Sequence, residues 1–397
     1  MRLLSTFLLT LFIFSDLFIF GVPSVAAYGD SWVKLSPMPE GSSNFAVAPL
    51  GEKIYAINSN FTYVYDSFLD TWSSKTTLPN STNPEDTYMV AACNNKIYAF
   101  GGTTYNSTSG WYVNIGSNLM YDPSVNMWTT KTPIPTPRSE MQANVIGDKI
   151  YLIGGWVKNT GSLADLGKNG TQTIVSNANE VYDPSTNSWT ELAPVPVPVM
   201  NYASAVIGDK IYIIGGDNPT AIANSTQIYD SKTNTWSFGK SLPNIVPNKM
   251  GGMAATAISG INEPTRVFVF GGRGWQGVSN VTYIYNPTDD SWATGAPMPT
   301  PRYDLAVASL DDRIYAIGGT DGSLGTTTGT WPYQQLISFA TNEEYLFSGY
   351  KGSTPTPFPS LTVSPLVVTL SSIVVITVII IAEVLTIKKR HKTARSS

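Results

Sequence analysis

The sequence predicts an all-β fold in which six four-stranded units close into a ring, a six-bladed β-propeller, followed by a C-terminal transmembrane helix. Three observations lead to this prediction. A short apolar segment recurs six times, a Tyr–Trp pair of constant spacing follows five of these segments, and a spare Trp stands near the N-terminus. Gly and Pro are frequent (33 and 27 of 397 residues) and only 13% of residues are charged, which indicates a turn-rich chain and not a coiled coil.

The recurring segment consists of a turn, a run of β-branched and aromatic residues, and usually a Gly-Gly doublet. Its six copies are GEKIYAINS (51–59), NNKIYAFGG (94–102), GDKIYLIGG (147–155), GDKIYIIGG (208–216), TRVFVFGG (265–272) and DDRIYAIGG (311–319). Because the run is short and apolar throughout, we expect a strand buried on both faces. The doublet allows positive φ and a close backbone approach, which we expect where the blades crowd around the central axis.

The second recurring element is a Tyr followed seven residues later by a Trp, with a polar turn between them. The pairs are Tyr65 and Trp72, Tyr121 and Trp128, Tyr182 and Trp189, Tyr229 and Trp236, and Tyr285 and Trp292. Turn sequences such as Asp-Pro-Ser-Thr-Asn favour a hairpin, because an Asx side chain closes the turn and Pro presets φ. With the segment that follows each Trp, each unit has four strands in about 40 to 60 residues, the pattern of propeller blades.

The sixth unit lacks a Trp of its own. It runs to Tyr345 and then reaches Gly352 where a Trp is expected, whereas Trp32 is a surplus copy. We therefore expect an N-terminal strand to complete the sixth blade and close the ring. The doublets and the spaced Tyr and Trp residues resemble kelch repeats over about residues 30–347. This resemblance implies a six-bladed kelch-type β-propeller, which we place at residues 28–348.

The two ends of the chain predict a single-pass protein of the cell membrane. Residues 1–27 resemble a cleaved secretory signal, with a retained anchor as the alternative. Residues 366–387 are long and apolar enough to cross a bilayer, and the basic tail 388–397 is expected in the cytoplasm by the positive-inside rule. Residues 349–365, rich in Pro, Thr and Ser, are typical of an extended stalk. The propeller would then lie outside the cell.

Composition argues against several classes of function. The 24 basic residues less Arg2 and five in the tail leave 18 outside the membrane, and the 28 acidic residues less Asp16 and Glu383 leave 26, so the exterior carries a net charge of about −8. This disfavours nucleic acid as a partner. The chain has one His (His391) and one Cys (Cys93), which argues against metal sites and a Cys–His couple and leaves no internal disulfide. We expect no metal and no cofactor.

The loops are the expected site of function, because kelch propellers share a fold and not an activity. Insertions concentrate between the second and third strands: the interval from doublet to Tyr varies from 6 to 27 residues, whereas the interval from Trp to doublet is 27 residues in four of six cases. Loops that vary on a constant scaffold often bind ligands. The resemblance implies a ligand face at the channel mouth, with candidates Arg138, Trp156, Tyr202, Asp217, Lys249, Arg273, Arg302, Tyr303 and Asp321.

The expected function is a binding module for an extracellular protein or glycan, in adhesion or scaffolding, because Arg and aromatic side chains are common anchors of recognition. The alternatives are a structural envelope protein and an enzyme acting on sugars, for instance through Arg138, Glu140 and Arg302. Since no spacing singles out an acid–base pair, we expect no catalytic residue. Six sequons are candidate glycosylation sites: Asn60, Asn80, Asn106, Asn169, Asn224 and Asn280.

Overall fold

The computed structural model describes residues 30–43, 45–79, 88–106, 111–157, 174–218, 224–243, 251–258, 264–274, 277–324 and 336–347. All of these belong to one compact unit, residues 1–351. The described residues form 31 strands and no helix, so they contain no helix able to span a membrane. The predicted signal (1–27), stalk (349–365), transmembrane segment (366–387) and tail (388–397) lie outside the described residues.

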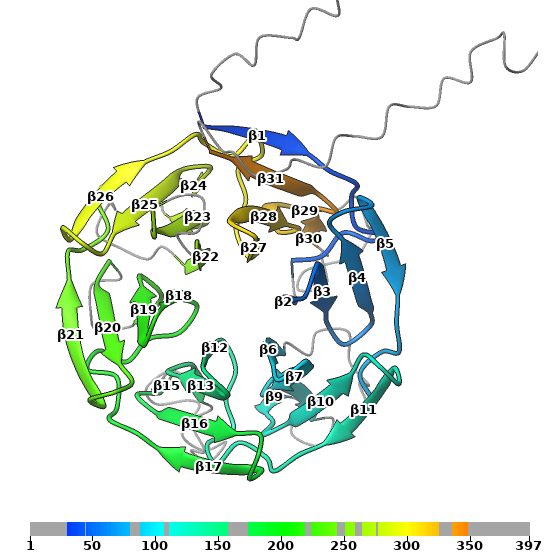
Figure 1. Ribbon diagram of the computed structural model, residues 1–397, viewed down its shortest axis with the longest axis vertical. Coiled ribbons are helices and arrows are strands. Elements are labelled where there is room, and N and C mark those ends of the chain that lie inside the picture. Colours follow the sequence, from blue (N-terminus) through cyan, green and yellow to red (C-terminus); the bar gives the residue numbers. More distant parts are fainter. Residues whose placement is uncertain are drawn as a thin grey trace, which may run out of the picture. The chain divides into compact units, whose positions relative to one another are not determined.

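Six antiparallel sheets, each with a path of four strands, form a ring (Figure 1). In blades 1 to 5 the strands run in chain order from the inside to the outside of the ring. Blade 1 has β2 (Ala46–Leu50), β3 (Lys53–Ile57), β4 (Thr62–Asp66) and β5 (Thr71–Ser74); blade 2 has β6 (Met89–Cys93), β7 (Lys96–Phe100), β10 (Asn118–Asp122) and β11 (Met127–Thr130); blade 3 has β12 (Gln142–Ile146), β13 (Lys149–Ile153), β16 (Asn179–Asp183) and β17 (Ser188–Glu191).

The second half of the ring continues this order. Blade 4 has β18 (Ala203–Ile207), β19 (Lys210–Ile214), β20 (Thr226–Asp230) and β21 (Thr235–Gly239); blade 5 has β22 (Gly251–Ala257), β23 (Val267–Gly274), β25 (Thr282–Asn286) and β26 (Ser291–Thr294); blade 6 has β27 (Ala306–Leu310), β28 (Arg313–Ile317), β31 (Asn342–Leu346) and β1 (Ser31–Lys34). The predicted six-bladed architecture is confirmed.

The N-terminal strand closes the ring, as the surplus Trp32 predicts. Strand β1 pairs antiparallel with β31 and sets Trp32 opposite Tyr345 (Figure 1). The indole Nε1 of Trp32 donates to the Ala296 carbonyl at 2.9 Å, which ties blade 6 to the segment after blade 5. The Tyr345 hydroxyl donates to Asp30 at 2.7 Å. The first described residues thus supply both an outer strand and a hydrogen-bond acceptor that blade 6 lacks in its own sequence.

The extra elements of the loops lie between the second and third strands, where the sequence places the insertions. They are β8 (Thr103–Asn106) with β9 (Trp111–Asn114), β14 (Trp156–Val157) with β15 (Ile174–Val175), β24 (Gly277–Val278) against the end of β23, and β29 (Thr320–Leu324) with β30 (Leu336–Ser338). Blades 2, 3, 5 and 6 therefore have additional strands at one end. The loops that lead into the innermost strands lie at the same end.

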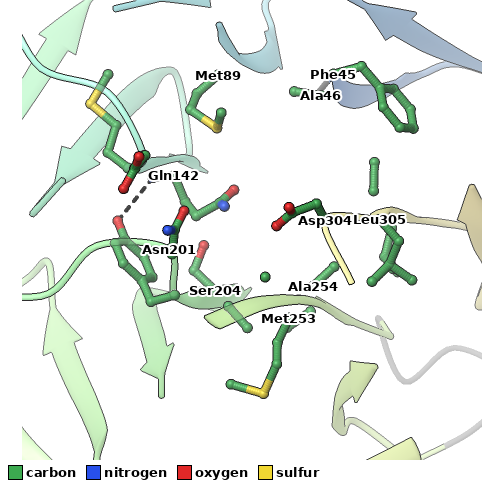
Figure 2. Close-up of a pocket in the computed structure, with 18 of the residues that line it drawn as sticks. Phe45, Ala46, Met89, Gln142, Asn201, Ser204, Met253, Ala254, Asp304 and Leu305 are labelled. Carbon is green, nitrogen blue, oxygen red and sulfur yellow. Dashed lines mark hydrogen bonds between the residues drawn. The ribbon is translucent and has the colours of Figure 1, made fainter. Parts of the chain in front are cut away.

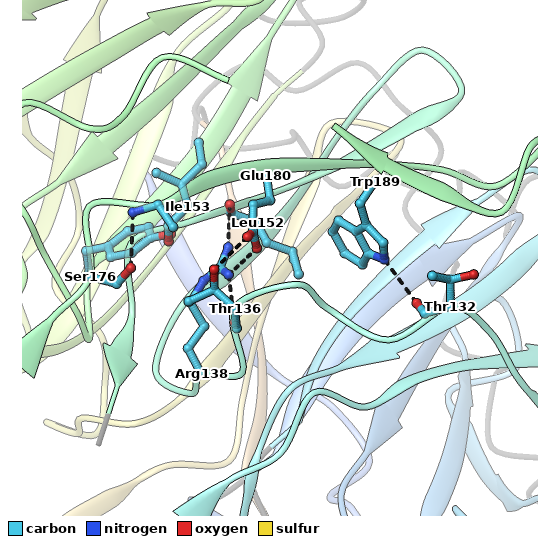
Figure 3. Close-up of polar contacts among 10 residues, drawn as sticks. Thr132, Thr136, Arg138, Leu152, Ile153, Ser176, Glu180 and Trp189 are labelled. Atoms are coloured by element: carbon cyan, nitrogen blue, oxygen red, sulfur yellow. Dashed lines mark hydrogen bonds and ion pairs between the residues drawn. The ribbon is translucent and has the colours of Figure 1, made fainter. Parts of the chain in front are cut away.

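The Tyr–Trp pair fastens each blade to the one before it. In blade 3 the Tyr182 hydroxyl donates to Asn187 Oδ1 at 2.7 Å, and the same oxygen accepts the N–H of Thr132, after blade 2, at 3.0 Å. Trp189 Nε1 donates to the carbonyl of Thr132 at 3.0 Å (Figure 3). We call this arrangement the Tyr–Asx–Trp latch. Its other four copies hold Ser36, Thr76, Ala193 and Lys240 in the same way.

The latch explains why Asn or Asp stands five residues after each of these Tyr residues. Asn187 has a φ of 51°, and its counterparts have similar values. Asn and Asp tolerate this left-handed conformation better than other residues with a side chain, and they also provide the acceptor oxygen. One residue type therefore meets a backbone requirement and a hydrogen-bonding requirement.

The first glycine of a doublet is required by the next blade and the second by the loop that leads into its own blade, so the expectation that crowding at the central axis requires the doublets is wrong. A side chain at Gly154, where φ is 62°, would come within 2.4 Å of the Val199 carbonyl oxygen. The N–H of Gly155 donates to the same oxygen at 2.8 Å. Val199 belongs to the loop that leads into blade 4, so this loop crosses directly over the doublet of blade 3. Glycine is needed because backbone meets backbone there.

Apolar clusters fill the spaces between the blades. Each of the six clusters draws its residues from two neighbouring blades, and together they follow the whole ring. The second strands contribute the most deeply buried side chains, such as Ile97, Ile150 and Ile211, each fully inaccessible. The prediction that these strands are buried on both faces is confirmed. Cys93 is buried in the same layer, and burial raises the pKa of its thiol to about 11.

Candidate functional site

The innermost strands enclose a cavity of about 550 Å³ at the centre of the ring (Figure 2). Blades 1, 2 and 6 line it with apolar side chains, among them Ala46, Met89 and Leu305. Blades 3 and 4 contribute the polar side chains Gln142 and Ser204. The cavity therefore has an apolar wall and a polar wall, and its polar character increases where the loops lead into the inner strands.

A left-handed residue marks the mouth of this cavity in four successive blades. Glu140, Asn201, Gly252 and Asp304 have φ values of 54°, 51°, 69° and 50°. The N–H of Asn201 donates to the Glu140 carbonyl, and the N–H of Asp304 to the Gly252 carbonyl, both at 2.9 Å, so neighbouring blades are joined at these positions. All four residues line the cavity, and Figure 2 shows the Asp304 carboxylate pointing into it. The backbone is fixed here, whereas the side chain differs from blade to blade.

A second pocket of about 480 Å³ adjoins the mouth between blades 4, 5 and 6. Asp217 and Arg273 line it together with Tyr303, and Asn201, Gly252 and Asp304 belong to both pockets. A side chain at Gly251 would come within 2.7 Å of an Asp217 oxygen, and one at Gly252 within 2.5 Å of an Asp304 oxygen. The two glycines at the start of β22 therefore leave the room that these carboxylates occupy.

The charges at the mouth are mostly negative. Burial, together with repulsion from Asp217 and Asp304, raises the pKa of Glu140 to about 7. Desolvation by the surrounding blades and repulsion from Asp217 raise the pKa of Asp304 to about 6, although Arg273 acts in the opposite direction. The Asp304 side chain nevertheless remains exposed to the channel. In the described ranges no three His, Cys, Asp or Glu side chains are arranged to hold a metal ion.

Among the described residues that line this mouth, Arg273 is the cation. Its guanidinium lies 5.4 Å from the centre of the Tyr303 ring, and its Nη1 donates to the Tyr303 hydroxyl at 3.3 Å. The Arg273 residue is exposed, so its remaining donors are accessible. Asp217 is positioned by an antiparallel backbone bridge with Met200, and Trp156 by an equivalent bridge with Ser139.

The structure brings five of the predicted binding residues to the two pockets. Asp217, Arg273 and Tyr303 line the pocket at the mouth, and Trp156 and Tyr202 line the central cavity. Tyr202 is completely buried, however, and its hydroxyl donates to the Ile153 carbonyl at 2.5 Å and accepts the N–H of Gln142 at 3.1 Å. Its hydrogen-bonding capacity is therefore used within the fold. Asp321 is exposed but lines neither pocket, and Lys249 lies outside the described residues.

Arg138 and Arg302 are not available to a ligand, which corrects their assignment to the binding face. Both side chains are fully buried. Arg138 pairs with Glu180 and donates to the Leu152 carbonyl at 2.9 Å (Figure 3). Arg302 pairs with Glu343 at 2.7 Å. Each Arg thus inserts into the following blade between its second and third strands, where its charge is neutralised by a buried carboxylate.

The candidate glycosylation sites differ in their surroundings. Asn60 is exposed, Asn224 is half-buried, and Asn280 donates its side-chain amide to the Met298 carbonyl at 3.3 Å, so its nitrogen is engaged. Asn106 lies in β8. Asn80 and Asn169 lie outside the described residues. Their use for glycosylation stays a prediction.

Sequence reasoning missed three polar residues of the mouth. The repeat pattern marks neither Asn201 nor Asp304 as a binding residue, and it offers Glu140 only as part of an enzyme site. Each precedes the first residue of its inner strand by two positions. This shared position was the available signal, but the residue type changes from blade to blade and therefore does not stand out in the repeat.

Comparison with known proteins supports the fold assignment. A family model of the KLHDC2/KLHL20/DRC7 kelch-repeats domain matches residues 51–260 and 201–363. Kelch-like protein 26 of Danio rerio is 29% identical over 60% of this chain and 36% of its own length, and Kelch-like protein terF of Aspergillus terreus is 28% identical over 75% of this chain and 50% of its own. This chain therefore matches half or less of these relatives' length.

Among solved structures, that of YjhT has the same fold. The TM-score is 0.62, with 18% identity over 77% of this chain and 95% of that one. Identity this low supports the fold alone. The family-model match, which covers most of the propeller, together with the doublets and the latches, shows that the chain belongs to the kelch-repeat family of β-propellers.

Proposed function

We propose that this chain is a membrane-anchored binding module that holds a protein ligand at the channel mouth of its propeller. Kelch propellers are a family of protein-interaction modules. The observation that carries the proposal is the convergence of Asp217, Arg273, Tyr303 and Asp304 from three blades at a pocket that Gly251 and Gly252 keep open. Convergent polar groups in a concave site are the usual mark of a binding site.

The charge of the mouth favours a basic ligand. In the described part of the chain, the charged residues that line the two pockets are Glu140, Asp217, Asp304 and Arg273, three acids and one base. A Lys or Arg side chain of a partner would complement this excess of carboxylates. An apolar residue beside it would fit the apolar wall of the central cavity. We therefore propose a partner segment that carries a basic and an apolar residue together.

A protein fits the mouth better than a glycan. Sugars commonly stack on the open face of an aromatic ring, but Arg273 lies over the Tyr303 ring at 5.4 Å. Glycan recognition stays the alternative ligand class. The location at the cell surface is also part of the proposal and is supported only by the signal-like residues 1–27, the apolar segment 366–387 and the basic tail.

The full chain in detergent can test the site with arrays of short peptides and of glycans. Basic–apolar peptides should bind better than acidic–apolar ones, and the double variant Asp217→Asn with Asp304→Asn should weaken binding at least about tenfold. Asp289→Asn, an exposed acidic position in a turn of blade 5, is the matched control and should bind as the unaltered chain does. Equal binding of basic and acidic peptides, or unchanged affinity in the double variant, would refute the proposal.

An enzyme acting on sugars is the second candidate, and one observation favours it. The pKa of about 7 at Glu140, in a cavity, suits a group that exchanges protons near neutral pH. Loss of a sugar-converting activity in Glu140→Gln, with peptide binding absent in the unaltered chain, would support this candidate over a binding module. No ligand and no activity would leave the structural role in an envelope.

A further inference from the structure

Four large apolar side chains are exposed at the turns between the third and fourth strands of blades 1 and 2. Phe68 and Leu69, between β4 and β5, are 65% and 51% exposed. Val125 and Met127, between β10 and β11 and at the start of β11, are 61% and 59% exposed. We call these four residues the apolar tip.

The repeat shows that the scaffold does not need apolar side chains at these positions. The four residues of the apolar tip occupy the third, fourth and sixth positions after the latch Tyr. In blades 3, 4 and 5 these three positions are all polar. They are Ser185, Thr186 and Ser188 in blade 3, Lys232, Thr233 and Thr235 in blade 4, and Thr288, Asp289 and Ser291 in blade 5. Because those blades keep the same latch, the apolar residues of blades 1 and 2 serve something other than the fold.

The chain leaves the propeller on the same side, at the neighbouring blade. In blade 6 no turn joins the third strand β31 to the fourth strand β1, because β1 comes from the N-terminal part of the chain. Ser31 pairs with Leu346, so both described ends lie where the other blades have this turn. Blade 6 adjoins blade 1 (Figure 1). The connection toward residues 366–387 thus begins on the turn side of blade 6, one blade away from Phe68 and Leu69 and two blades away from Val125 and Met127.

This connection is short. Residues 348–365 separate Phe347 from the apolar segment 366–387. These 18 residues span at most about 60 Å when fully extended. If residues 366–387 cross a bilayer, the side of the propeller that carries the apolar tip stays within reach of its surface.

The surface beside the apolar tip carries paired charges and two further acidic residues: Asp70 in the turn of blade 1 and Glu52 in the adjoining hairpin turn, whose carbonyl accepts from Ser67. Asp66 and Asp122, which precede the two turns, are paired with Lys53 at 3.2 Å and Lys96 at 2.9 Å. The neighbouring hairpin turn of blade 2 is the uncharged Asn94-Asn95, where blades 3 and 4 have Gly-Asp. Exposed apolar side chains beside a few acidic ones can enter the interfacial layer of a membrane that carries no net charge.

We propose that the apolar tip rests in the interfacial layer of the lipid bilayer that anchors the chain. This inference rests on the membrane anchoring in the proposed function. The turns of the apolar tip and the loops of the channel mouth lie at opposite ends of the blade strands. The bilayer therefore receives the turn side, and the mouth with Asp217, Arg273 and Asp304 faces away from the lipid, open to a partner.

The test places one environment-sensitive dye on the full chain in phosphatidylcholine nanodiscs that contain doxyl-labelled lipid. Cys93 is 4% exposed, so a cysteine introduced at the surface is labelled selectively. Leu69→Cys and Val125→Cys report on the apolar tip. Thr186→Cys and Thr233→Cys, at the same turn position of blades 3 and 4, are the matched controls. We expect quenching by the doxyl lipid at 69 and 125 to exceed that at 186 and 233 by at least about twofold, because the tip would lie at headgroup depth.

Other outcomes overturn the proposal and separate it from the proposed function. Equal quenching at all four positions, with the chain still in the nanodisc, overturns only the inference. A dye at 69 that is shielded from aqueous iodide but not quenched by lipid indicates that a second copy or a protein partner covers the tip, which also overturns it. A chain that does not enter nanodiscs refutes the anchoring, and the inference falls with it.

A second variant guards against a local effect of the label. Phe68→Ser, Leu69→Ser, Val125→Ser and Met127→Ser together give blades 1 and 2 the polar turns of the other blades, so the melting midpoint should not change. A dye at Ser124→Cys should then lose its quenching by the doxyl lipid. Persistent quenching in this variant would contradict a role for the apolar tip.

Discussion

Replacing Trp32 by Ala should destabilise the propeller by about 3 kcal/mol. The indole donates a hydrogen bond of 2.9 Å to the Ala296 carbonyl, worth about 1 kcal/mol. Its ring also makes edge contacts with Phe270 and Tyr345, with centroids 5.5 and 5.1 Å away, each worth about 1 kcal/mol. Because β1 has no covalent turn to β31, loss of these contacts should also release the closing strand.

Two variants separate these contributions. Trp32→Phe keeps the ring contacts and loses the hydrogen bond, so the free energy of unfolding should fall by only about 1 kcal/mol. Trp189→Ala is the matched control inside the ring, since Trp189 donates to the Thr132 carbonyl at 3.0 Å and its ring lies 5.0 Å from Tyr182. A similar loss of stability is expected there, but β17 stays attached to β16 through its turn.

Urea denaturation followed by circular dichroism measures the stability of the full chain in detergent, and hydrogen exchange locates the opening. Trp32→Ala should speed exchange at residues 31–34 and 342–346, whereas Trp189→Ala should not speed exchange of its own outer strand to the same extent. A Trp32→Ala chain that unfolds within about 0.5 kcal/mol of the unaltered one, with unchanged exchange at 342–346, would refute the closure argument.

Three further predictions concern the latch, the mouth and the buried ion pairs. Tyr182→Phe removes one hydrogen bond of a latch and should lower the free energy of unfolding by about 1 kcal/mol in calorimetry, so an unchanged value would contradict the role of the hydroxyl. The pKa of Glu140 is raised to about 7, so its ionisation disfavours the folded state as the pH rises through that value. Glu140→Gln should therefore melt higher than the unaltered chain at pH 8 and about equally at pH 4, below the ordinary pKa of a glutamate, and a lower melting temperature at pH 8 would show the sign to be wrong. Arg138→Leu leaves Glu180 buried without its cation and should lower the free energy of unfolding by about 3 to 5 kcal/mol in urea denaturation. Adding Glu180→Leu to this variant should restore most of the loss, and equal instability of the single and double variants would argue against the pair.

The repeat predicts the scaffold well because its requirements are local. The turn that places Asn187 next to Tyr182 is encoded within five residues, so the hairpin could be read from the pattern. The partner of Trp189 could not, since it is the backbone carbonyl of Thr132, 57 residues earlier, and a carbonyl leaves no mark on residue type. The same reason explains the mistaken role of the doublets, because the Val199 oxygen above Gly154 belongs to another blade.

The burial of Arg138 and Arg302 could have been predicted by comparing the sequences of the six blades. Glu180 and Glu343 stand at the second position of the third strand, in blades 3 and 6. The loops that lead into those blades carry Arg138 and Arg302 after Thr-Pro. Blades 1, 2, 4 and 5 have Tyr, Leu, Gln and Tyr at this position of the third strand. The joint occurrence of Arg and Glu in the same two blades indicates a pair within the fold, whereas each Arg taken alone looks like a surface anchor.

The residues of the mouth differ from scaffold residues because the fold requires only their backbone conformation and not their side chains. At this position the fold requires a left-handed residue whose backbone hydrogen-bonds to the next blade, and Gly252 meets that requirement without strain. Glu140 and Asp304 adopt the same conformation at a cost of about 1 kcal/mol each, and their raised pKa values show that their ionisation is also unfavourable. These side chains destabilise the fold through both backbone conformation and ionisation, at a position where glycine would be sufficient. Contact with a ligand is the explanation that we favour for them. If the mouth holds a ligand, as we propose, it is the part of the propeller where binding takes precedence over stability.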